Sequence, residues 1–109
     1  MLSFLKNSFE ESREKLIEKK LIIKDYNDLG LHLIKYNFNN TELDSETKKC
    51  KGLIVDNDCN IVCVPPYKSE DINLFLEESV NDNSDIIYEE FIDGTMINIF
   101  YYKDAWHIS

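Results

Sequence analysis

Short apolar runs separated by turn-forming residues set the tightest limit on the fold of this chain. Residues 52–56 (GLIVD) and 60–64 (NIVCV) are two such runs, and Asp56, Asn57 and Asp58 stand between them. Short runs rich in β-branched side chains and bounded by Asn, Asp, Gly or Pro are typical of strands, so this spacing predicts a β-hairpin. Because the chain has 109 residues, its strands are expected to belong to one small domain.

Two helices and further strands are expected in the rest of the chain. Ser8 followed by Glu11 fits a capping box and predicts a helix over residues 8–20. Ser69 suits the start of a second, short helix over residues 70–79. The expected strands are 31–36, 52–56, 60–64, 86–92, 95–102 and 105–109. The sequence therefore predicts an α+β fold, with a mainly antiparallel sheet, an N-terminal helix and a short second helix.

Charge and composition narrow the range of functions. The chain has 21 acidic and 12 basic residues and a formal net charge of −9, which repels nucleic acid at long range. Contact with phosphates would therefore need a few local cations. The uncharged apolar stretches are far shorter than the roughly 20 residues of a membrane-spanning helix, and acidic residues interrupt any signal-peptide pattern. No membrane partner is expected.

Three cysteines, Cys50, Cys59 and Cys63, make an odd count without an export signal. This favours reduced thiols and a cytoplasmic location, which would be the host cytoplasm or a virion if the chain is viral. Cys59 and Cys63 would be about 13 Å apart on a strand, too far to share a zinc ion, and no CxxC or HxxxH pair occurs. Buried structural cysteines are expected, and no metal ligands.

The pair Asp93-Gly94 lies between the expected strands 86–92 and 95–102. Asp-Gly between apolar runs is one of the strongest short-range signals for a tight hairpin, and such a turn needs no function. From the residues alone, two interpretations stay open: an ordinary turn, or a catalytic loop.

Three segments in order favour the second interpretation: HLIKYN (32–37), CKGLIVDNDCNIVCVPPYKS (50–69) and YEEFIDGTMINIFYYKDAWHIS (88–109). Together they resemble the N-terminal part of the phage-type RNA ligase family, within the covalent nucleotidyltransferases. That family shows a tyrosine after an apolar strand, an Arg-Gly pair opening a hairpin, a Pro-aromatic-Lys stretch and a catalytic loop Lys-x-Asp-Gly. The resemblance implies that residues 1–109 are a single, incomplete domain of the ligase adenylation type, because the family's domain continues further.

The resemblance also implies a set of site residues. In that family the loop lysine attacks the α-phosphate of ATP and passes AMP to a 5′-phosphate end of RNA. Aligning the two Asp-Gly pairs puts Phe91 at the position of this lysine, and phenylalanine has no nucleophilic atom. No catalytic residue is therefore expected. The implied cofactors are ATP and Mg²⁺, and the implied nucleotide-binding residues are Tyr36, Lys51, Lys68, Glu90, Asp93 and Gly94.

Each of these residues also has an ordinary structural interpretation. Lys51 and Lys68 would be solvated surface charges, Tyr36 and Phe91 sheet aromatics, and Asp93 a turn residue. Lys51 also stands where the family has an arginine, and it lacks the planar fork that binds a phosphate through two hydrogen bonds.

Three functions follow from these residues. The leading one is an RNA ligase-like nucleotidyltransferase domain that is catalytically inactive and retains binding of a nucleotide or an RNA end. A second is an active ATP-dependent RNA ligase, completed by a longer chain or a partner, in which Lys68 or Lys103 serves as nucleophile. A third is an acidic protein-interaction or virion-type structural module, in which a protein partner or a second copy covers an open sheet edge.

Overall fold

The computed structural model describes residues 2–39, 41–66, 69, 71–79, 87–90 and 93–109. Its elements, in chain order, are α1 (Phe9–Glu18), β1 (Ile22–Tyr26), β2 (Leu31–Lys35), the short 3-10 helix η1 (Thr47–Lys49), β3 (Lys51–Asp56), β4 (Ile61–Cys63), α2 (Ile72–Ser79), β5 (Ile99–Tyr102) and β6 (Ala105–Ile108). The expected α+β class, with an N-terminal helix, a short second helix and an antiparallel sheet, is confirmed.

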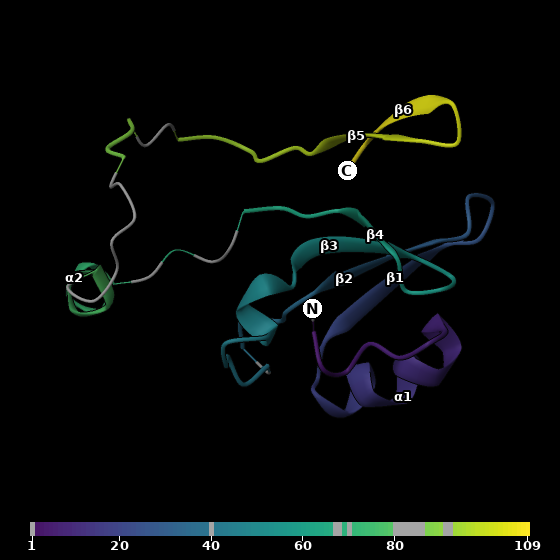
Figure 1. Ribbon diagram of the computed structural model, residues 1–109, viewed down its shortest axis with the longest axis horizontal. Coiled ribbons are helices and arrows are strands. Elements are labelled where there is room, and N and C mark those ends of the chain that lie inside the picture. The colour runs from purple at the N-terminus through teal and green to yellow at the C-terminus, as the bar shows by residue number, and fades with distance from the viewer. Residues whose placement is uncertain (1, 40, 67–68, 70, 80–86, 91–92) are drawn as a thin grey trace.

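The strands form two separate antiparallel sheets. Strands β1 to β4 pair in sequential order, and β5 and β6 pair with each other and with no other described strand. Figure 1 shows α1 below the four-stranded sheet, the β5–β6 hairpin above it, and α2 off to one side. The four-stranded sheet is therefore a middle layer with a different neighbour on each face.

Helix α1 begins where the capping signal predicts. The side chain of Ser8 accepts a hydrogen bond from the backbone N–H of Glu11, at 3.3 Å. The helix ends at Glu18 because Lys20 adopts a left-handed conformation with φ of 59°, and the Leu21 N–H donates back to the Leu16 carbonyl. Such a left-handed residue at a helix end turns the chain out of the helix and here leads it into β1.

Each face of the four-stranded sheet carries its own apolar core. The core facing α1 contains Leu2, Phe4, Leu5, Phe9, Leu16, Leu21, Ile34, Cys50, Leu53, Val55 and Cys59. The core facing the hairpin contains Leu31, Ile54 and Phe100. Because both faces of β3 are covered, this strand is a continuous apolar run in the sequence instead of an alternating one.

The observed strands differ from the expected ones in two places. Strand β1 was not among the expected strands, because Lys24 and Asp25 interrupt its apolar pattern. The expected strand over 86–92 is absent from its described part, residues 87–90, and residues 93–98 do not belong to a strand either. The expected hairpin around Asp93-Gly94 is therefore not formed in the described part of the chain.

A tight turn does occur in the C-terminal part of the chain, between β5 and β6. Tyr102 pairs with Ala105, and the two residues between them, Lys103 and Asp104, have φ of 48° and 62°. Two consecutive residues with positive φ are the requirement of the two-residue turn that suits a twisted hairpin. From this turn the two strands pair back to Ile99 with Ile108, and beyond that pair Asn98 and Ser109 exchange two backbone hydrogen bonds of 2.9 Å.

Candidate functional site

A cleft of about 490 Å³ opens on the face of the four-stranded sheet that faces the hairpin. Its size is within the range of small-molecule binding sites. Lysines from three adjacent strands line it: Lys24 from β1, Lys35 from β2 and Lys51 from β3. The other described residues around it are Tyr26, Leu33, Tyr36, Gly52, Pro65, Pro66, Met96, Asn98 and Ser109.

Lys51 faces this cleft because of a break in the strand register. Ile34 pairs with Leu53 but the next residue, Lys35, pairs with Lys51, so Gly52 is an extra residue in β3. In a regular strand, Lys51 would lie on the same face as Leu53 and point toward α1. The one-residue bulge moves it to the opposite face. Gly52 has φ of 103°, a conformation that glycine adopts readily and other residues avoid.

The resulting pair of lysines is unusual for a sheet. Lys35 and Lys51 lie directly opposite each other, and like charges in this position destabilise strand pairing. Within the described residues, neither forms an ion pair. The Nζ of Lys24 lies 5.2 Å from the ring centroid of Tyr26. A protein with a net charge of −9 thus gathers three cations around one cleft, which suits an anionic ligand.

Two tyrosines give the cleft aromatic walls. Tyr26 packs partly against the core that faces the hairpin, and Tyr36 packs partly against the core that faces α1. The backbone N–H of Tyr36 donates to the Cys50 carbonyl at 2.6 Å, which holds the end of β2 beside the start of β3. Both side chains are half-buried and border the cleft, so each provides an aromatic group beside the lysines.

The structure brings together some of the residues predicted from the sequence. Tyr36 and Lys51 line the cleft. Glu90, Asp93 and Gly94 are exposed and are not among its described lining residues. Two further predicted positions, Lys68 and Phe91, lie outside the described residues.

Sequence reasoning missed Lys24, Tyr26 and Lys35. The first two belong to β1, which is not among the expected strands, and Lys35 lies within the expected strand 31–36 without a predicted role in the site. A usable signal exists, because residues two apart on a strand share a face. Lys24 with Tyr26, and Leu33 with Lys35, follow that spacing.

The cleft fits part of the cofactor set that the sequence resemblance implies. Three ammonium groups and two aromatic rings suit the phosphates and the flat base of a nucleotide such as ATP. Mg²⁺ prefers carboxylate oxygens and water, and the described lining residues include no aspartate or glutamate. Nor do the described residues anywhere contain a group of three or more His, Cys, Asp or Glu side chains placed to hold a metal ion.

A second polar cluster lies on the other face of the sheet, between the sheet and α1. The Nδ1 of His32 lies 2.7 Å from Asp25, and its Nε2 lies 2.7 Å from the side-chain oxygen of Asn57. Arg13 donates to both carboxylate oxygens of Asp25, at 3.1 and 3.2 Å, and these hydrogen bonds, with that of His32, hold the pKa of Asp25 below its usual range. His32 is only 4% exposed, and the ring of Phe9 stacks on it at 3.8 Å.

This cluster is structural. Both ring nitrogens of His32 are engaged by Asp25 and Asn57, so neither is directed at a nucleophile or an open site. Its contacts join α1 to β1, β2 and the turn that follows β3. It therefore holds the helix on the sheet that carries the cleft.

The three cysteines do not provide a nucleophile. All are free thiols, with Cys50 and Cys59 buried and Cys63 half-buried. Burial raises the pKa of Cys50 to about 12 and also raises the pKa of Cys63. The Sγ of Cys59 lies 3.5 Å from the Oγ of the buried Ser12. Buried thiols are inert, so Cys50 and Cys59 suit the structural role expected from the sequence, whereas Cys63 is only half-buried.

Comparisons with known proteins do not identify a family. No protein-family model, curated protein or solved structure matches the chain. Among the described residues, no helix has the length and apolar character needed to cross a membrane. The resemblance to RNA ligases stays a prediction, and the chemistry of the cleft is the basis for a functional proposal.

Proposed function

We propose that this protein is an RNA ligase-like nucleotidyltransferase domain without covalent activity, which binds a nucleotide or a 5′-phosphorylated RNA end in the sheet cleft. The observation that carries the proposal is the Lys35–Lys51 pair, turned toward the cleft by the bulge at Gly52. A left-handed bulge residue and two opposed like charges both reduce stability. Local features that lower the stability of the fold, and that no stabilising contact offsets, are expected at binding sites.

The lysines and tyrosines have separate roles in this proposal. Lys35 and Lys51 would neutralise a phosphate group, and Lys24 would contact a neighbouring phosphate or the sugar-phosphate backbone. Lysine ammonium groups act as flexible point charges, so they bind phosphates without imposing one orientation. Tyr26 and Tyr36 would stack against a base, a contact available to every nucleobase.

The absence of a covalent step rests on the sequence resemblance. Phe91 stands where the resemblance requires an amine nucleophile. Lys103 is a poor substitute, because its Nζ lies 3.5 Å from the carbonyl oxygen of Leu29 and 5.3 Å from the ring centroid of Tyr102, at the hairpin turn. It is not among the described residues that line the cleft.

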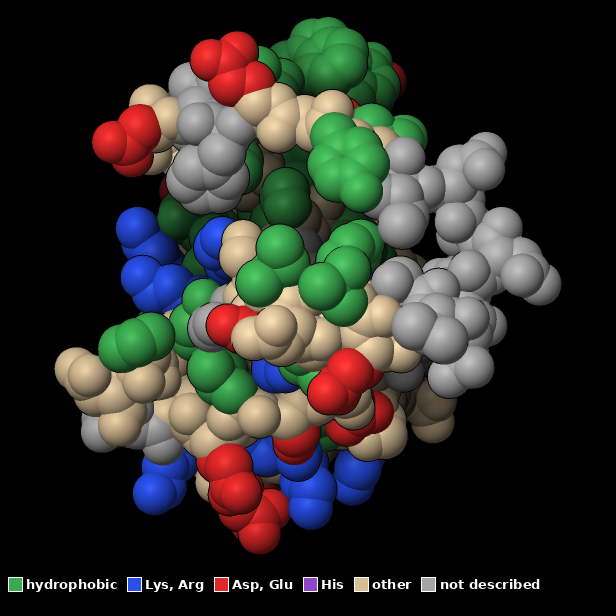
Figure 2. Space-filling view, turned by 90° about the vertical axis from the view of Figure 1, so that its left-hand side faces the viewer, with side chains coloured by type: hydrophobic (Ala, Val, Ile, Leu, Met, Phe, Trp, Pro, Cys, Tyr) green, Lys and Arg blue, Asp and Glu red, His purple; other side chains and the backbone are tan. Residues whose placement is uncertain are grey.

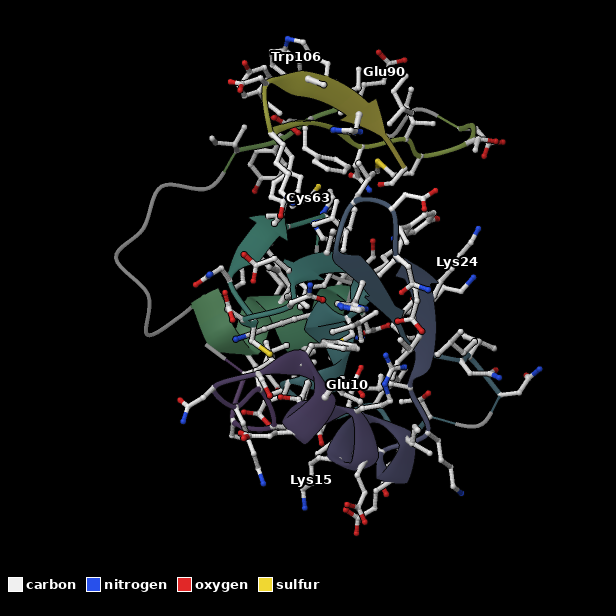
Figure 3. The ribbon with its side chains drawn as sticks, turned by 90° about the vertical axis from the view of Figure 1, so that its right-hand side faces the viewer. Glu10, Lys15, Lys24, Cys63, Glu90 and Trp106 are labelled. Carbon is white, nitrogen blue, oxygen red and sulfur yellow. The ribbon has the colours of Figure 1, made fainter. Side chains whose placement is uncertain are left out.

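Binding can be tested with a short fluorescent RNA that carries a 5′-phosphate, with its 5′-hydroxyl counterpart as the ligand control. Fluorescence anisotropy should show tighter binding of the 5′-phosphate form. Lys51→Gln and Lys35→Gln should each weaken it by about tenfold or more, the usual size of a charged contact. Lys15→Gln is the matched control variant, because Lys15 points away from the sheet on the far side of α1 (Figure 3).

Two results would contradict this function. Equal binding of the two RNAs, or equal losses for Lys51→Gln and Lys15→Gln, would show that the cleft is not a phosphate site. Incubation with α-labelled ATP and Mg²⁺ tests the other half of the proposal. A labelled, base-sensitive protein adduct would mean that another lysine serves as nucleophile.

A further inference from the structure

The β5–β6 hairpin has an apolar face that no described residue of the chain covers. Ile99 pairs with Ile108 and Tyr101 pairs with Trp106, so these four side chains lie on one face of the hairpin. Ile97 extends the row beyond β5, because the backbone hydrogen bonds between Asn98 and Ser109 continue the pairing past Ile99 and Ile97 is two residues before Ile99. We call these five residues the outer hairpin face. They are between 56% and 71% exposed, with Trp106 the most exposed.

The opposite face of the same hairpin is packed. Phe100 is 9% exposed and lies in the core with Leu31 and Ile54. In Figure 3, Cys63 lies between the hairpin and the sheet, whereas Trp106 lies on the side away from the sheet. Hydrophobic side chains also gather at the upper end of the molecule in Figure 2, where the hairpin lies.

A two-stranded ribbon with apolar side chains on both faces is stable only when each face packs against another layer that excludes water. An isolated hairpin is at best marginally stable in water, and packing against a further layer is what stabilises it. Strands with apolar residues on both faces are typical of sheets that have neighbours on both sides. The four-stranded sheet covers one face of the hairpin, and among the described residues none covers the outer hairpin face.

We propose that the outer hairpin face is a homodimer interface, covered by the same face of a second copy of this chain. Two aromatic and three isoleucine side chains, each more than half exposed, offer about 500 Å² per copy. Two copies would bury about 1,000 Å², the size at which a specific interface begins. Tryptophan and tyrosine are also the residues that contribute most at interface centres.

The arrangement of the face suits a two-fold contact with itself. A two-fold axis in the interface plane, perpendicular to the strands, reverses the strand direction of the second copy. It places the larger pair, Tyr101 and Trp106, against the smaller pair, Ile99 and Ile108, of the other copy. Large side chains then meet small ones at both ends, as in sheets that pack face to face about 10 Å apart.

Charge sets the conditions under which this dimer forms. Each copy has a net charge of −9, so the two copies repel each other at low ionic strength. Salt screens this repulsion and strengthens apolar association, so the dimer should become tighter as salt is added. A basic protein partner on the same face would show the opposite salt dependence.

Sedimentation velocity at protein concentrations up to about 100 μM, in about 50 and 500 mM NaCl, tests this interface. The expected result is a shift from monomer toward dimer mass that is larger at high salt. Trp106 is the only tryptophan in the chain, so its fluorescence reports on this face alone. Its emission should shift to shorter wavelength, and acrylamide should quench it less, as the mass rises.

The double variant Ile99→Thr with Ile108→Thr keeps β-branched side chains in both strands and should raise the dimer Kd by about tenfold or more. Ile17→Thr is the matched control, because Ile17 is an exposed isoleucine of α1, and it should leave the Kd unchanged. Circular dichroism establishes that each variant is folded.

Four outcomes would overturn the proposal. They are a monomer at every concentration and salt, a dimer that weakens with salt, equal association by the double variant and Ile17→Thr, or a dimer in which Trp106 emission stays that of an exposed side chain. The last would place the interface elsewhere. The proposal is independent of phosphate binding, because none of the five residues lines the cleft.

Discussion

At the scale of single residues, Gly52 decides on which face of the sheet the charge of Lys51 lies. The glycine has φ of 103°, and no heavy atom lies within 4 Å of the place where a β-carbon would stand. Substitution with alanine therefore brings conformational strain without a clash. Gly52→Ala should lower the free energy of unfolding by about 1–3 kcal/mol, as measured by urea denaturation.

The strain could instead be relieved by removing the bulge, which would turn Lys51 toward α1. Anisotropy with the 5′-phosphorylated RNA separates the two responses. A folded Gly52→Ala protein that binds RNA normally would show that the bulge is not needed to present Lys51. Unchanged stability together with lost binding would indicate that β3 has shifted its register.

Lys51 itself should show a conflict between stability and binding. Because it lies directly opposite Lys35, Lys51→Gln removes a like-charge repulsion and should stabilise the protein by about 0.2–1 kcal/mol. The gain should shrink with added salt, because salt screens exposed charges. Thermal unfolding at low and high salt measures it, and Lys15→Gln should show the opposite sign, because it removes the ion pair of Lys15 with Glu18 at 3.4 Å. A destabilised Lys51→Gln protein would mean that Lys51 has a structural partner.

At the scale of elements, Asp25 of β1 accepts hydrogen bonds from Arg13 of α1, and this contact between helix and strand is sensitive to acid. Hydrogen bonds from Arg13, and then from His32, lower the pKa of Asp25 in the folded protein. A lowered pKa contributes stability above the unfolded value of about 3.9, and this contribution is lost as the pH falls through the folded value. The melting temperature should therefore fall with pH below about pH 4, in part because of Asp25.

Asp25→Asn should reduce the slope of melting temperature against pH in that acidic range. Some slope should remain, because backbone N–H groups of Thr47 and Glu46 lower the pKa of Asp44 in the same direction. Asp58→Asn, at an exposed position in the turn after β3, is the control and should leave the slope unchanged. Identical slopes for Asp25→Asn and the parent protein would contradict a role for this contact in acid stability.

The elements also show what could be predicted from the sequence and what could not. The capped start of α1 and the hairpin of β3 and β4 were predictable, because local signals such as Ser8 and the Asp-Asn-Asp turn determine them. Strand β1 was not, because its stability comes from pairing with β2 and from the contact of Asp25 with α1. Its cleft residues, Lys24 and Tyr26, were missed with it.

The same limit applies to the candidate site. Tyr36 and Lys51 were named from a motif, but their position in one cleft depends on the bulge between β2 and β3. Lys35 enters the site only as the partner of Lys51 across this bulge. Such a change of register is a property of two paired strands, and neither strand alone encodes it.

At the scale of the whole molecule, the net charge of −9 and the three cleft lysines act on RNA in opposite directions. Only the lysines release counterions from bound phosphates, and single strands lose about 0.7 logarithmic units of affinity per contact for each tenfold rise in salt. Three contacts limit the slope to about −2. The net negative charge makes it shallower still, because salt also screens the long-range repulsion of RNA.

Anisotropy titrations of the 5′-phosphorylated RNA between about 50 and 400 mM NaCl measure this slope. Lys24→Gln, Lys35→Gln and Lys51→Gln should each make it shallower by about 0.7, whereas Lys15→Gln should leave it as it is. A slope well beyond −2 would require more cations than the described residues of the cleft provide, and would mean that RNA also contacts cations other than Lys24, Lys35 and Lys51. A slope that the three cleft variants leave unchanged would assign the binding to contacts that do not involve these lysines.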